Sequence, residues 1–333
     1  MPALAVADAL RAEGASVTFV GGERAEAELV PAAGYPLSPI RVEGLHRRNP
    51  LKAARAVVRA ALAVIRSAGL LRSLRAQVVL GGGGYVAGPV GLAAALLRIP
   101  LVLTEADSHL GISNRLLAPF AARVCLAFPI RGRSGSRYLV TGRPVPAPAT
   151  DVAAARARFG LSLDDTVVLV FGGSLGARSI NFAAVEAFQG ATFRVLHAAG
   201  VRDFEALTSP GEHYDLRPYI HEFSDALLAA DLVVARSGGS IFEVAAHGRP
   251  AILIPYPAAA ADHQSSNAAW MEQGGAAVVI PDSELTATRL AHEVADLLHD
   301  RSRLAAMAHA SAALARPDAA RDIAAELLAA AGR

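Results

Sequence analysis

The stretch Thr166-Val-Val-Leu-Val-Phe-Gly-Gly-Ser-Leu-Gly-Ala-Arg178 joins an apolar, β-rich run to a glycine-rich turn. A short apolar run bounded by glycines predicts a buried strand, and the residues from Ser179 onward predict a helix. Glycines at positions 172, 173 and 176 allow main-chain amides to approach an anion closely, and the helix N-terminus adds a partial positive charge. We therefore expect a diphosphate site here. The alternative is a glycine turn that only lets the strand pack against the helix.

Strand-like runs alternate with alanine-rich helical stretches along the rest of the chain. The expected strands are residues 16–20, 77–80, 101–104, 123–128 and 137–141 in the first half, and 166–171, 193–198, 231–235, 251–255 and 276–280 in the second. A proline-rich segment, Gly142-Arg-Pro-Val-Pro-Ala-Pro-Ala149, separates the two halves. This alternation predicts an α/β protein with two doubly wound parallel sheets and a ligand cleft at the carboxyl ends of their strands.

The first half opens on a helix, predicted for residues 2–12, with no strand before it. In a doubly wound unit the central strand and its phosphate-facing turn normally come first. We therefore expect either a variant of this fold or a first strand that precedes the sequence in hand.

Composition supports two domains and excludes several classes of protein. The chain has 333 residues, of which 53% are hydrophobic, enough for two ordinary cores. No apolar run reaches the roughly 20 residues that span a bilayer, and the N-terminus lacks the basic region of a secretory signal. The single cysteine, Cys125, cannot form an internal disulfide, and we expect a buried thiol in a reducing cytosol.

The net charge of +2 is the sum of two opposite halves. Residues 1–150 contain 18 Lys and Arg against 8 Asp and Glu, a net +10, whereas residues 151–333 contain 14 against 22, a net −8. The basic excess lies between Arg41 and Arg75, interleaved with apolar residues. This pattern predicts a helix that lies on an anionic membrane surface; an amphipathic helix packed on a sheet is the alternative. Nucleic acid is disfavoured because no aromatic residues interleave with the arginines.

Three further segments contain groups suited to a ligand. The loop Gly81-Gly-Gly-Gly-Tyr-Val-Ala-Gly88 leaves its backbone open to a phosphate, or is a flexible turn. Residues 231–243 predict a strand, a glycine turn and a helix whose Glu243 suits ribose hydroxyls or only the helix dipole. Asp262-His-Gln264 follows a buried strand and suits sugar hydroxyls, or is a solvated helix cap.

Taken in order, these motifs resemble the family 28 glycosyltransferases of bacteria that add N-acetylglucosamine to undecaprenyl-diphosphate-linked muramyl pentapeptide, the lipid I to lipid II step of peptidoglycan synthesis. The matching segments are residues 2–7, 83–89, 104–114, 172–178, 222–225, 236–243 and 262–264. The resemblance implies a GT-B fold with an acceptor domain at 1–145, a UDP-sugar domain at 146–316, and a helix at about 317–333 that returns to the first domain. It also implies inverting transfer without a metal or other cofactor.

The resemblance also assigns site residues by position. Those implied for the donor are Gly173, Ser174, Leu175, Gly176, Arg178, Ser224, Gly238, Gly239, Ser240, Ile241, Phe242, Glu243, His263 and Gln264. Within this set the 173–178 loop would hold the diphosphate, the Ser224 backbone would read uracil, and Glu243 would bind ribose. Those implied for the acceptor are Gly82, Gly83, Gly84, Tyr85, Asp107 and Asn114. The implied partners are the UDP-sugar, the lipid-linked acceptor, cell-wall synthesis proteins and the inner face of the cell membrane, reached through residues 41–75.

The sequence departs from the family pattern at three places. Thr104-Glu-Ala-Asp107 stands where the family has His-Glu-Gln-Asn, and Arg143-Pro-Val-Pro146 stands where it has Asn-Pro-Val-Arg. The family's first strand and its Gly-Gly-Thr-Gly-Gly-His loop, which holds the implicated base, would precede Pro2. The catalytic residue is therefore unknown within this sequence, and we expect it to bind a UDP-sugar but to transfer poorly.

Two other functions stay open at this stage. One is another GT-B activity, either a different UDP-sugar transferase or a UDP-sugar 2-epimerase. The other is a nucleotide-sugar-binding module without catalysis. A dinucleotide oxidoreductase is disfavoured because neither glycine loop has the required spacing, and no group of residues has the spacing of zinc ligands.

Overall fold

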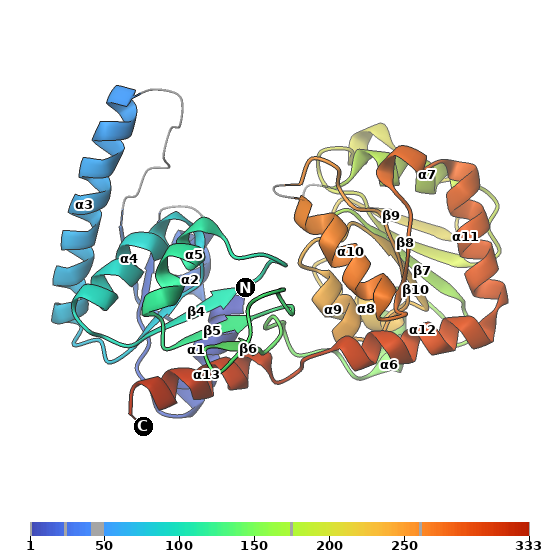
Figure 1. Cartoon of the computed structure of the whole chain (residues 1–333). Coiled ribbons are helices and arrows are strands. Elements are labelled where there is room, and N and C mark those ends of the chain that lie inside the picture. Colours follow the sequence, from blue (N-terminus) through green and yellow to red (C-terminus); the bar gives the residue numbers. More distant parts are fainter. Residues whose placement is uncertain (1, 23–24, 41–49, 174–175, 260–261, 333) are drawn as a thin grey trace. The chain divides into compact units, whose positions relative to one another are not determined.

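The computed structural model describes residues 2–22, 25–40, 50–173, 176–259 and 262–332 (Figure 1). The chain divides into two compact units. Unit 1 consists of residues 1–145 and 316–333, and unit 2 of residues 146–315. The predicted α/β class is confirmed, because every pair of neighbouring strands in the described residues is parallel.

Unit 1 contains two separate parallel sheets. The larger has the order β3-β4-β5-β6, with β3 (Val79–Gly81), β4 (Leu101–Glu105), β5 (Arg123–Leu126) and β6 (Tyr138–Val140). The smaller pairs β1 (Phe19–Gly21) with β2 (Leu37–Pro39). The helices are α1 (Pro2–Ala12), α2 (Ala25–Ala32), α3 (Pro50–Ser73), α4 (Gly84–Leu96), α5 (Ile112–Leu117), the 3-10 turn η1 (Ala118–Phe120) and α13 (Ala319–Ala330).

Helices cover both faces of the larger sheet because alternate strand residues point to opposite faces. Val102 and Cys125 pack against α1 and α13, whereas Leu103 and Val124 pack against α3, α4 and α5. The C-terminal helix α13 thus belongs to unit 1 and lies beside α1 (Figure 1). Burial raises the pKa of the Cys125 thiol to about 12, so it stays protonated and unreactive. None of the described helices combines the length and apolar character that a membrane span needs.

Unit 2 contains one six-stranded parallel sheet in the order β12-β11-β10-β7-β8-β9. Its strands are β7 (Val167–Phe171), β8 (Arg194–Ala198), β9 (Tyr214–Arg217), β10 (Leu232–Ala235), β11 (Ala251–Leu253) and β12 (Ala277–Val279). Its helices are α6 (Val152–Arg158), α7 (Arg178–Ala187), α8 (Phe223–Ala229), α9 (Ile241–Ala246), α10 (His263–Gln273), α11 (Ala287–His299) and α12 (Arg301–Leu314), with short 3-10 turns η2 (Phe204–Ala206) and η4 (Asp282–Glu284). All five residues of β7 are buried, as expected for a central parallel strand.

Two strands escaped the sequence prediction, and several predicted ends were wrong. β2 is only three residues long and contains Pro39, and β9 is an edge strand that alternates apolar with charged residues. Edge strands are less apolar than central ones, so both lack the signal of a buried run. The strand expected at 16–20 begins only at Phe19, and the one expected at 251–255 ends before Pro255.

We expect Leu327→Ala in α13 to destabilise unit 1 by about 2–5 kcal/mol, because Leu327 is 1% exposed within the cluster that joins α1 to the sheet. Hydrogen exchange of the α1 and β4 amides in increasing urea would measure the change. Arg321→Ala on the exposed face of the same helix should change it by less than about 0.5 kcal/mol. Equal losses in both variants would contradict this role of α13.

Candidate functional site

In unit 2 the predicted ligand segments meet at one edge of the sheet. β7, β10 and β11 are neighbouring parallel strands, so the segments that follow their carboxyl ends lie side by side. These segments are the glycine turn after β7, the Arg236–Ser240 turn after β10, and the segment after β11 that leads to α10. The structure therefore brings together three of the motifs that the sequence singled out.

In the turn after β7, two glycines allow close main-chain packing and a third leaves space for a ligand to approach the main chain. A Cβ added at Gly172 would lie 2.3 Å from the Ala177 nitrogen, and one at Gly176, where φ is +78°, would lie 2.0 Å from the Ala199 oxygen. Gly173 has φ of +90° and open space beside it. The helix that follows begins at Arg178 without a side-chain cap, so its first N–H groups can bind an anion. Ser174 and Leu175 lie outside the described residues.

Arg178 has an internal partner. Its guanidinium is 3.5 Å from the Asp203 carboxylate and lies over the Phe182 ring at 4.6 Å. The side chain is still 69% exposed. In the structure the Arg178 guanidinium therefore pairs with the Asp203 carboxylate, whereas the resemblance implied that Arg178 contacts the donor.

Arg236 organises the edge of the sheet and was missed by the sequence analysis. Its Nη1 donates to the carbonyls of Ile254 at 3.1 Å and Pro255 at 3.2 Å, and its Nη2 donates to Ser179 Oγ at 2.8 Å. The same guanidinium lies 2.6 Å from Asp282. One buried cation therefore ties β10, β11 and the start of α7 together. An arginine directly after a buried strand requires hydrogen-bond partners or an opposite charge. Its position in the sequence could therefore have identified Arg236 as a residue that organises the site.

The Gln264 amide is fixed beside the second glycine turn. Its Oε1 accepts from the Tyr256 N–H at 3.0 Å, and its main-chain carbonyl accepts from Ser237 Oγ at 2.7 Å. A Cβ added at Gly238 would lie 3.9 Å from Gln264 Nε2, so the NH₂ end of the amide is directed at this turn. Its neighbour His263 is the first residue of α10.

The residues from Gly238 to Glu243 make a turn and the start of α9. Ile241 and Phe242 are 0% and 6% exposed, and the Phe242 ring packs 5.5 Å from that of Trp270. Their side chains are therefore part of the core, because they occupy its face of α9. Ligand contact from these two positions is left to the main chain. Gly239 and Ser240 precede the helix, and Glu243 lies in its first turn.

Ser224 is linked to this helix through His247. The carbonyl of Glu243 accepts from His247 Nδ1 at 2.7 Å, so Nε2 carries no proton and accepts from Ser224 Oγ at 2.9 Å. Burial lowers the pKa of His247, which is consistent with this neutral ring. Ser224 Oγ also accepts from the Ala149 N–H at 2.7 Å. The Ser224 hydroxyl is thus engaged internally, which leaves its main chain for a ligand.

In unit 1 the glycine loop after β3 leads directly into α4. Gly83 and Gly84 have φ of +80° and +77°, and α4 begins at Gly84 without a side-chain cap. Ser113 Oγ donates to the Gly84 carbonyl at 2.9 Å and braces the loop from α5. Together with Gly82, this loop presents main-chain N–H groups at a helix N-terminus, the arrangement that binds phosphate. Tyr85 lies in the first turn of α4; its side chain is outside the described part of the chain.

Glu105 shapes the neighbouring loop and was also missed. This buried carboxylate accepts from the N–H groups of Asp107 at 3.2 Å and Gly111 at 2.8 Å, and from Asn114 Nδ2 at 3.0 Å. Asn114 is 1% exposed and also donates to the Thr104 carbonyl at 2.8 Å. Asn114 therefore holds the loop internally, whereas Asp107 stays partly exposed. Across the described ranges, no three His, Cys, Asp or Glu side chains gather as a metal site.

Comparison with known proteins identifies the family. Residues 1–126 match the glycosyltransferase family 28 N-terminal domain, and residues 167–323 match the family 28 C-terminal domain. The chain belongs to glycosyltransferase family 28. This family 28 chain is 41% identical over 331 residues to a UDP-N-acetylglucosamine--N-acetylmuramyl-(pentapeptide) pyrophosphoryl-undecaprenol N-acetylglucosamine transferase of Rubrobacter xylanophilus, with 98% of each chain covered. It is 40% identical to the enzyme of the same name from Moorella thermoacetica, covering 96% of this chain and 92% of that one.

Solved structures agree with the family. The chain is similar to the crystal structure of Acinetobacter baumannii MurG, with a TM-score of 0.81, 28% identity, and 98% and 95% of the two chains covered. A putative UDP-N-acetylglucosamine 2-epimerase from Listeria monocytogenes has a TM-score of 0.70 at 15% identity, with 98% and 92% covered. That second likeness concerns the fold alone. The predicted GT-B class and family are thereby confirmed.

A buried histidine supports the glycine turn of this family 28 site. The Asn181 Oδ1 accepts from His197 Nε2 at 3.1 Å, and His197 Nδ1 accepts from the Tyr214 hydroxyl at 2.7 Å. Asn181 Nδ2 in turn donates at 2.7 Å to the Ala199 carbonyl, the group against which Gly176 packs. Burial lowers the pKa of His197 to about 3, so the ring is neutral in the folded protein.

His197 should make the family 28 chain acid-sensitive. An unfolded histidine binds a proton below its ordinary pKa of about 6.5, whereas the folded one does not until about pH 3. Folding stability should therefore fall by up to about 1.4 kcal/mol per pH unit as pH decreases through this window. We expect His197→Gln to flatten this dependence in urea titrations, and His292→Gln at a 74% exposed position to leave it unchanged. An unaltered slope in the first variant would contradict the neutral ring.

Proposed function

We propose that this chain transfers N-acetylglucosamine from UDP-N-acetylglucosamine to the 4-hydroxyl of the muramyl sugar in undecaprenyl-diphosphate-linked muramyl pentapeptide. The observation that supports it best is the edge of the unit 2 sheet. There the open backbone at Gly173 and the uncapped start of α7 lie beside the Gly238 turn and the fixed Gln264 amide. Relatives at about 40% identity over nearly the whole chain are named for this transfer.

In this proposal the donor is held mainly by main-chain groups. The diphosphate accepts from N–H groups of the 172–177 turn, the main chain at Ser224 reads the uracil edge, and Glu243 accepts from ribose hydroxyls. Gln264 Nε2 donates to a hydroxyl of the sugar, since its Oε1 already accepts from Tyr256. Unit 1 holds the acceptor diphosphate at residues 82–84.

The reaction forms a bond from the acceptor oxygen to the anomeric carbon while the bond from that carbon to the UDP oxygen breaks, with inversion. The electron pair leaves with UDP, whose added charge is stabilised by the same N–H groups and the α7 dipole. These residues supply that stabilisation without a metal, which is part of the proposal. The acceptor hydroxyl gives its proton to a base, which the family pattern assigns to a histidine in a loop ahead of Pro2.

We expect Gln264→Ala to weaken the binding of UDP-N-acetylglucosamine by about tenfold, because one hydrogen bond to the sugar is worth about 1.4 kcal/mol. Binding of UDP alone should change by less than about twofold. Isothermal titration calorimetry would measure both ligands, with Gln273→Ala at the exposed end of α10 as control. Equal weakening of UDP and UDP-sugar would place Gln264 elsewhere than at the sugar.

We also propose that unit 1 binds the inner face of the cell membrane. The stretch predicted for this role begins at Arg41, but residues 41–49 lie outside the described part. Within α3, a stripe of Ala63, Ser67 and Leu71 is buried, while Ile65 is 67% exposed. The alternative interpretation, an amphipathic helix packed on the rest of unit 1, therefore accounts for one face of α3 only.

The neighbouring helices of unit 1 also expose large apolar side chains. The large apolar side chains exposed on α4, α5 and η1 are Leu92, Leu96, Ile112, Leu116 and Phe120. Arg98, which follows α4, and Arg115, within α5, are exposed as well. Apolar side chains bordered by arginines suit the boundary between acyl chains and anionic headgroups.

The triple variant Leu96→Glu, Leu116→Glu and Phe120→Glu should bind vesicles of anionic phospholipid at least about tenfold more weakly, because three carboxylates replace apolar side chains that are over 60% exposed. Vesicle sedimentation would measure the partition. Leu163→Glu in unit 2, at a 65% exposed leucine, is the control and should change nothing. Unchanged binding of the triple variant would refute this surface.

A further inference from the structure

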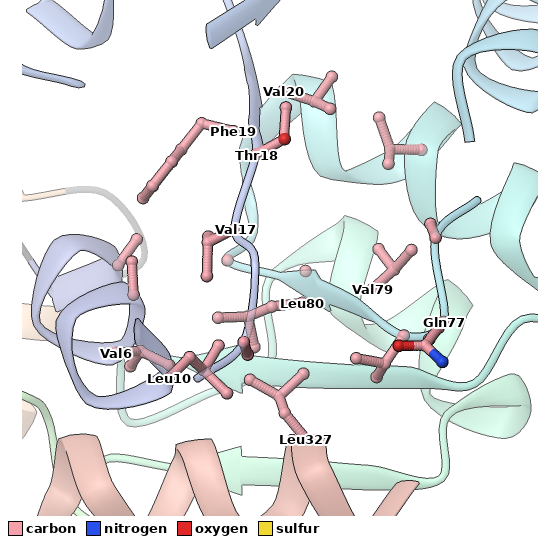
Figure 2. A pocket seen from close by; sticks show the side chains of 18 of the residues that line it. Val6, Leu10, Val17, Thr18, Phe19, Val20, Gln77, Val79, Leu80 and Leu327 are labelled. Atoms are coloured by element: carbon pink, nitrogen blue, oxygen red, sulfur yellow. The ribbon is translucent and has the colours of Figure 1, made fainter. Parts of the chain in front are cut away.

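A cavity in unit 1 and the ligand edge of unit 2 differ in the groups that they offer a ligand. The cavity has a volume of about 600 Å³ and lies between β1 and β3, with Val6, Leu10 and Leu327 together on one side (Figure 2). Such side chains offer a nucleotide no hydrogen bonds. In unit 2, by contrast, a polar side chain to which the proposed function gives no role, His247, hydrogen-bonds to two residues that do have a role.

The His247 ring is held by its own helix. His247 is the first residue after α9, and the Glu243 carbonyl accepts both from its main-chain N–H at 3.1 Å and from its Nδ1 at 2.7 Å. Because Nδ1 carries the proton, Nε2 is an acceptor. Burial lowers the pKa of His247, which favours the neutral ring and preserves this acceptor. The ring therefore has one fixed position and one fixed pattern of donor and acceptor.

The hydroxyl of Ser224 is held by two segments outside its own helix. Its Oγ donates to His247 Nε2 at 2.9 Å and accepts from the Ala149 N–H at 2.7 Å. Serine hydroxyls commonly hydrogen-bond to main-chain groups nearby in the sequence. Here both the proton and an acceptor site of the hydroxyl are engaged elsewhere, so the side chain does not compete with a ligand for the main chain of Ser224.

The start of α8 also has contacts that do not depend on His247. Asp225, the neighbour of Ser224, forms an ion pair with Arg158 of α6 at 2.7 Å. The last four residues of α8 are buried. Loss of the His247 contact should therefore release Ser224 from α9 without detaching α8 from the rest of unit 2.

We propose that His247 is a positioning residue for the nucleoside of the donor. Its ring joins the Ser224 hydroxyl to the Glu243 carbonyl, and so holds the main chain that reads uracil at a fixed place beside the residue that binds ribose. This role rests on the proposed function, which assigns those contacts to Ser224 and Glu243.

The consequence of this placement is a preference for uracil over cytosine. Uracil presents an oxygen acceptor at the position where cytosine presents an amino donor. A main-chain N–H donates to the oxygen and not to the amino group, and a hydrogen bond weakens steeply when its angle is poor. Displacement of Ser224 should therefore weaken the binding of a uracil nucleotide and leave that of a cytosine nucleotide nearly unchanged.

The test titrates the full chain with UDP and with CDP in a calorimeter. His247→Phe keeps a ring but removes both nitrogens, whereas His247→Gln returns an oxygen acceptor for Ser224. The matched control is His213→Phe. His213 is a partly buried histidine ahead of β9, and its Nε2 donates to the Phe188 carbonyl at 3.0 Å.

We expect His247→Phe to weaken UDP binding by about tenfold and CDP binding by less than about twofold. His247→Gln should keep UDP binding within about threefold of the unsubstituted chain. His213→Phe should leave the ratio of the two affinities unchanged, even where it lowers the thermal midpoint. An unchanged ratio in His247→Phe, or an equal fall in the ratio in His213→Phe, would overturn the proposal.

Ser224→Ala keeps the test decisive if His247→Phe is poorly stable. This variant removes the same hydrogen bond from its other end and should lower the UDP preference by about the same factor. The double variant should bind UDP as Ser224→Ala does, because both side chains act through one bond. Losses that multiply in the double variant would overturn the proposal.

The unsubstituted chain separates this inference from the proposed function. If it binds UDP and CDP equally, the uracil contact of the proposed function is wrong, and the role of His247 is wrong with it. If it prefers UDP, and both His247→Phe and Ser224→Ala keep that preference, only the role of His247 is wrong.

Discussion

The close approach of two main-chain segments, Gly176 against the Ala199 carbonyl, sets the position of the unit 2 site. The contact leaves no room for a Cβ, so the turn after β7 and the end of β8 must move as one. Asn181 holds that carbonyl, and the neutral His197 holds Asn181. Rigid placement matters because N–H groups stabilise a leaving diphosphate only where its charge develops.

In both units, a buried charged side chain at the end of a strand holds the neighbouring loop in place. In unit 1 the Glu105 carboxylate ends β4 and accepts from the N–H groups of the loop that follows. In unit 2 the Arg236 guanidinium follows β10 and donates to the carbonyls after β11. The charges are opposite because the loop after β4 presents N–H donors to the Glu105 carboxylate, whereas the segment after β11 presents carbonyl acceptors to the Arg236 guanidinium. Neither set of contacts uses the main chain of residues 82–84 or of Gly238 and Gly239, which the proposed ligands require.

Local features of the sequence were enough for much of the fold and part of the site. Short apolar runs and glycine-rich turns are signals that act within a few residues, so the central strands and both glycine loops could be predicted. Contacts between different elements could not be predicted: Arg236 pairs with Asp282, far along the chain, and Asn114 of α5 donates to the Thr104 carbonyl and the Glu105 carboxylate of β4. The core positions of Ile241 and Phe242 were missed because motif matching does not separate main-chain from side-chain contacts.

The opposite charges of the two halves now have a structural meaning. A net charge of −8 over residues 151–333 repels a diphosphate at long range, so attraction in unit 2 must come from groups in direct contact. The open glycine turn and the uncapped α7 provide such groups, while Arg178 is directed to Asp203. Main-chain N–H groups carry no net charge and bind only what fits their geometry. In the proposed function such groups select the shape of the donor diphosphate, whereas the net +10 of residues 1–150 attracts any anionic surface.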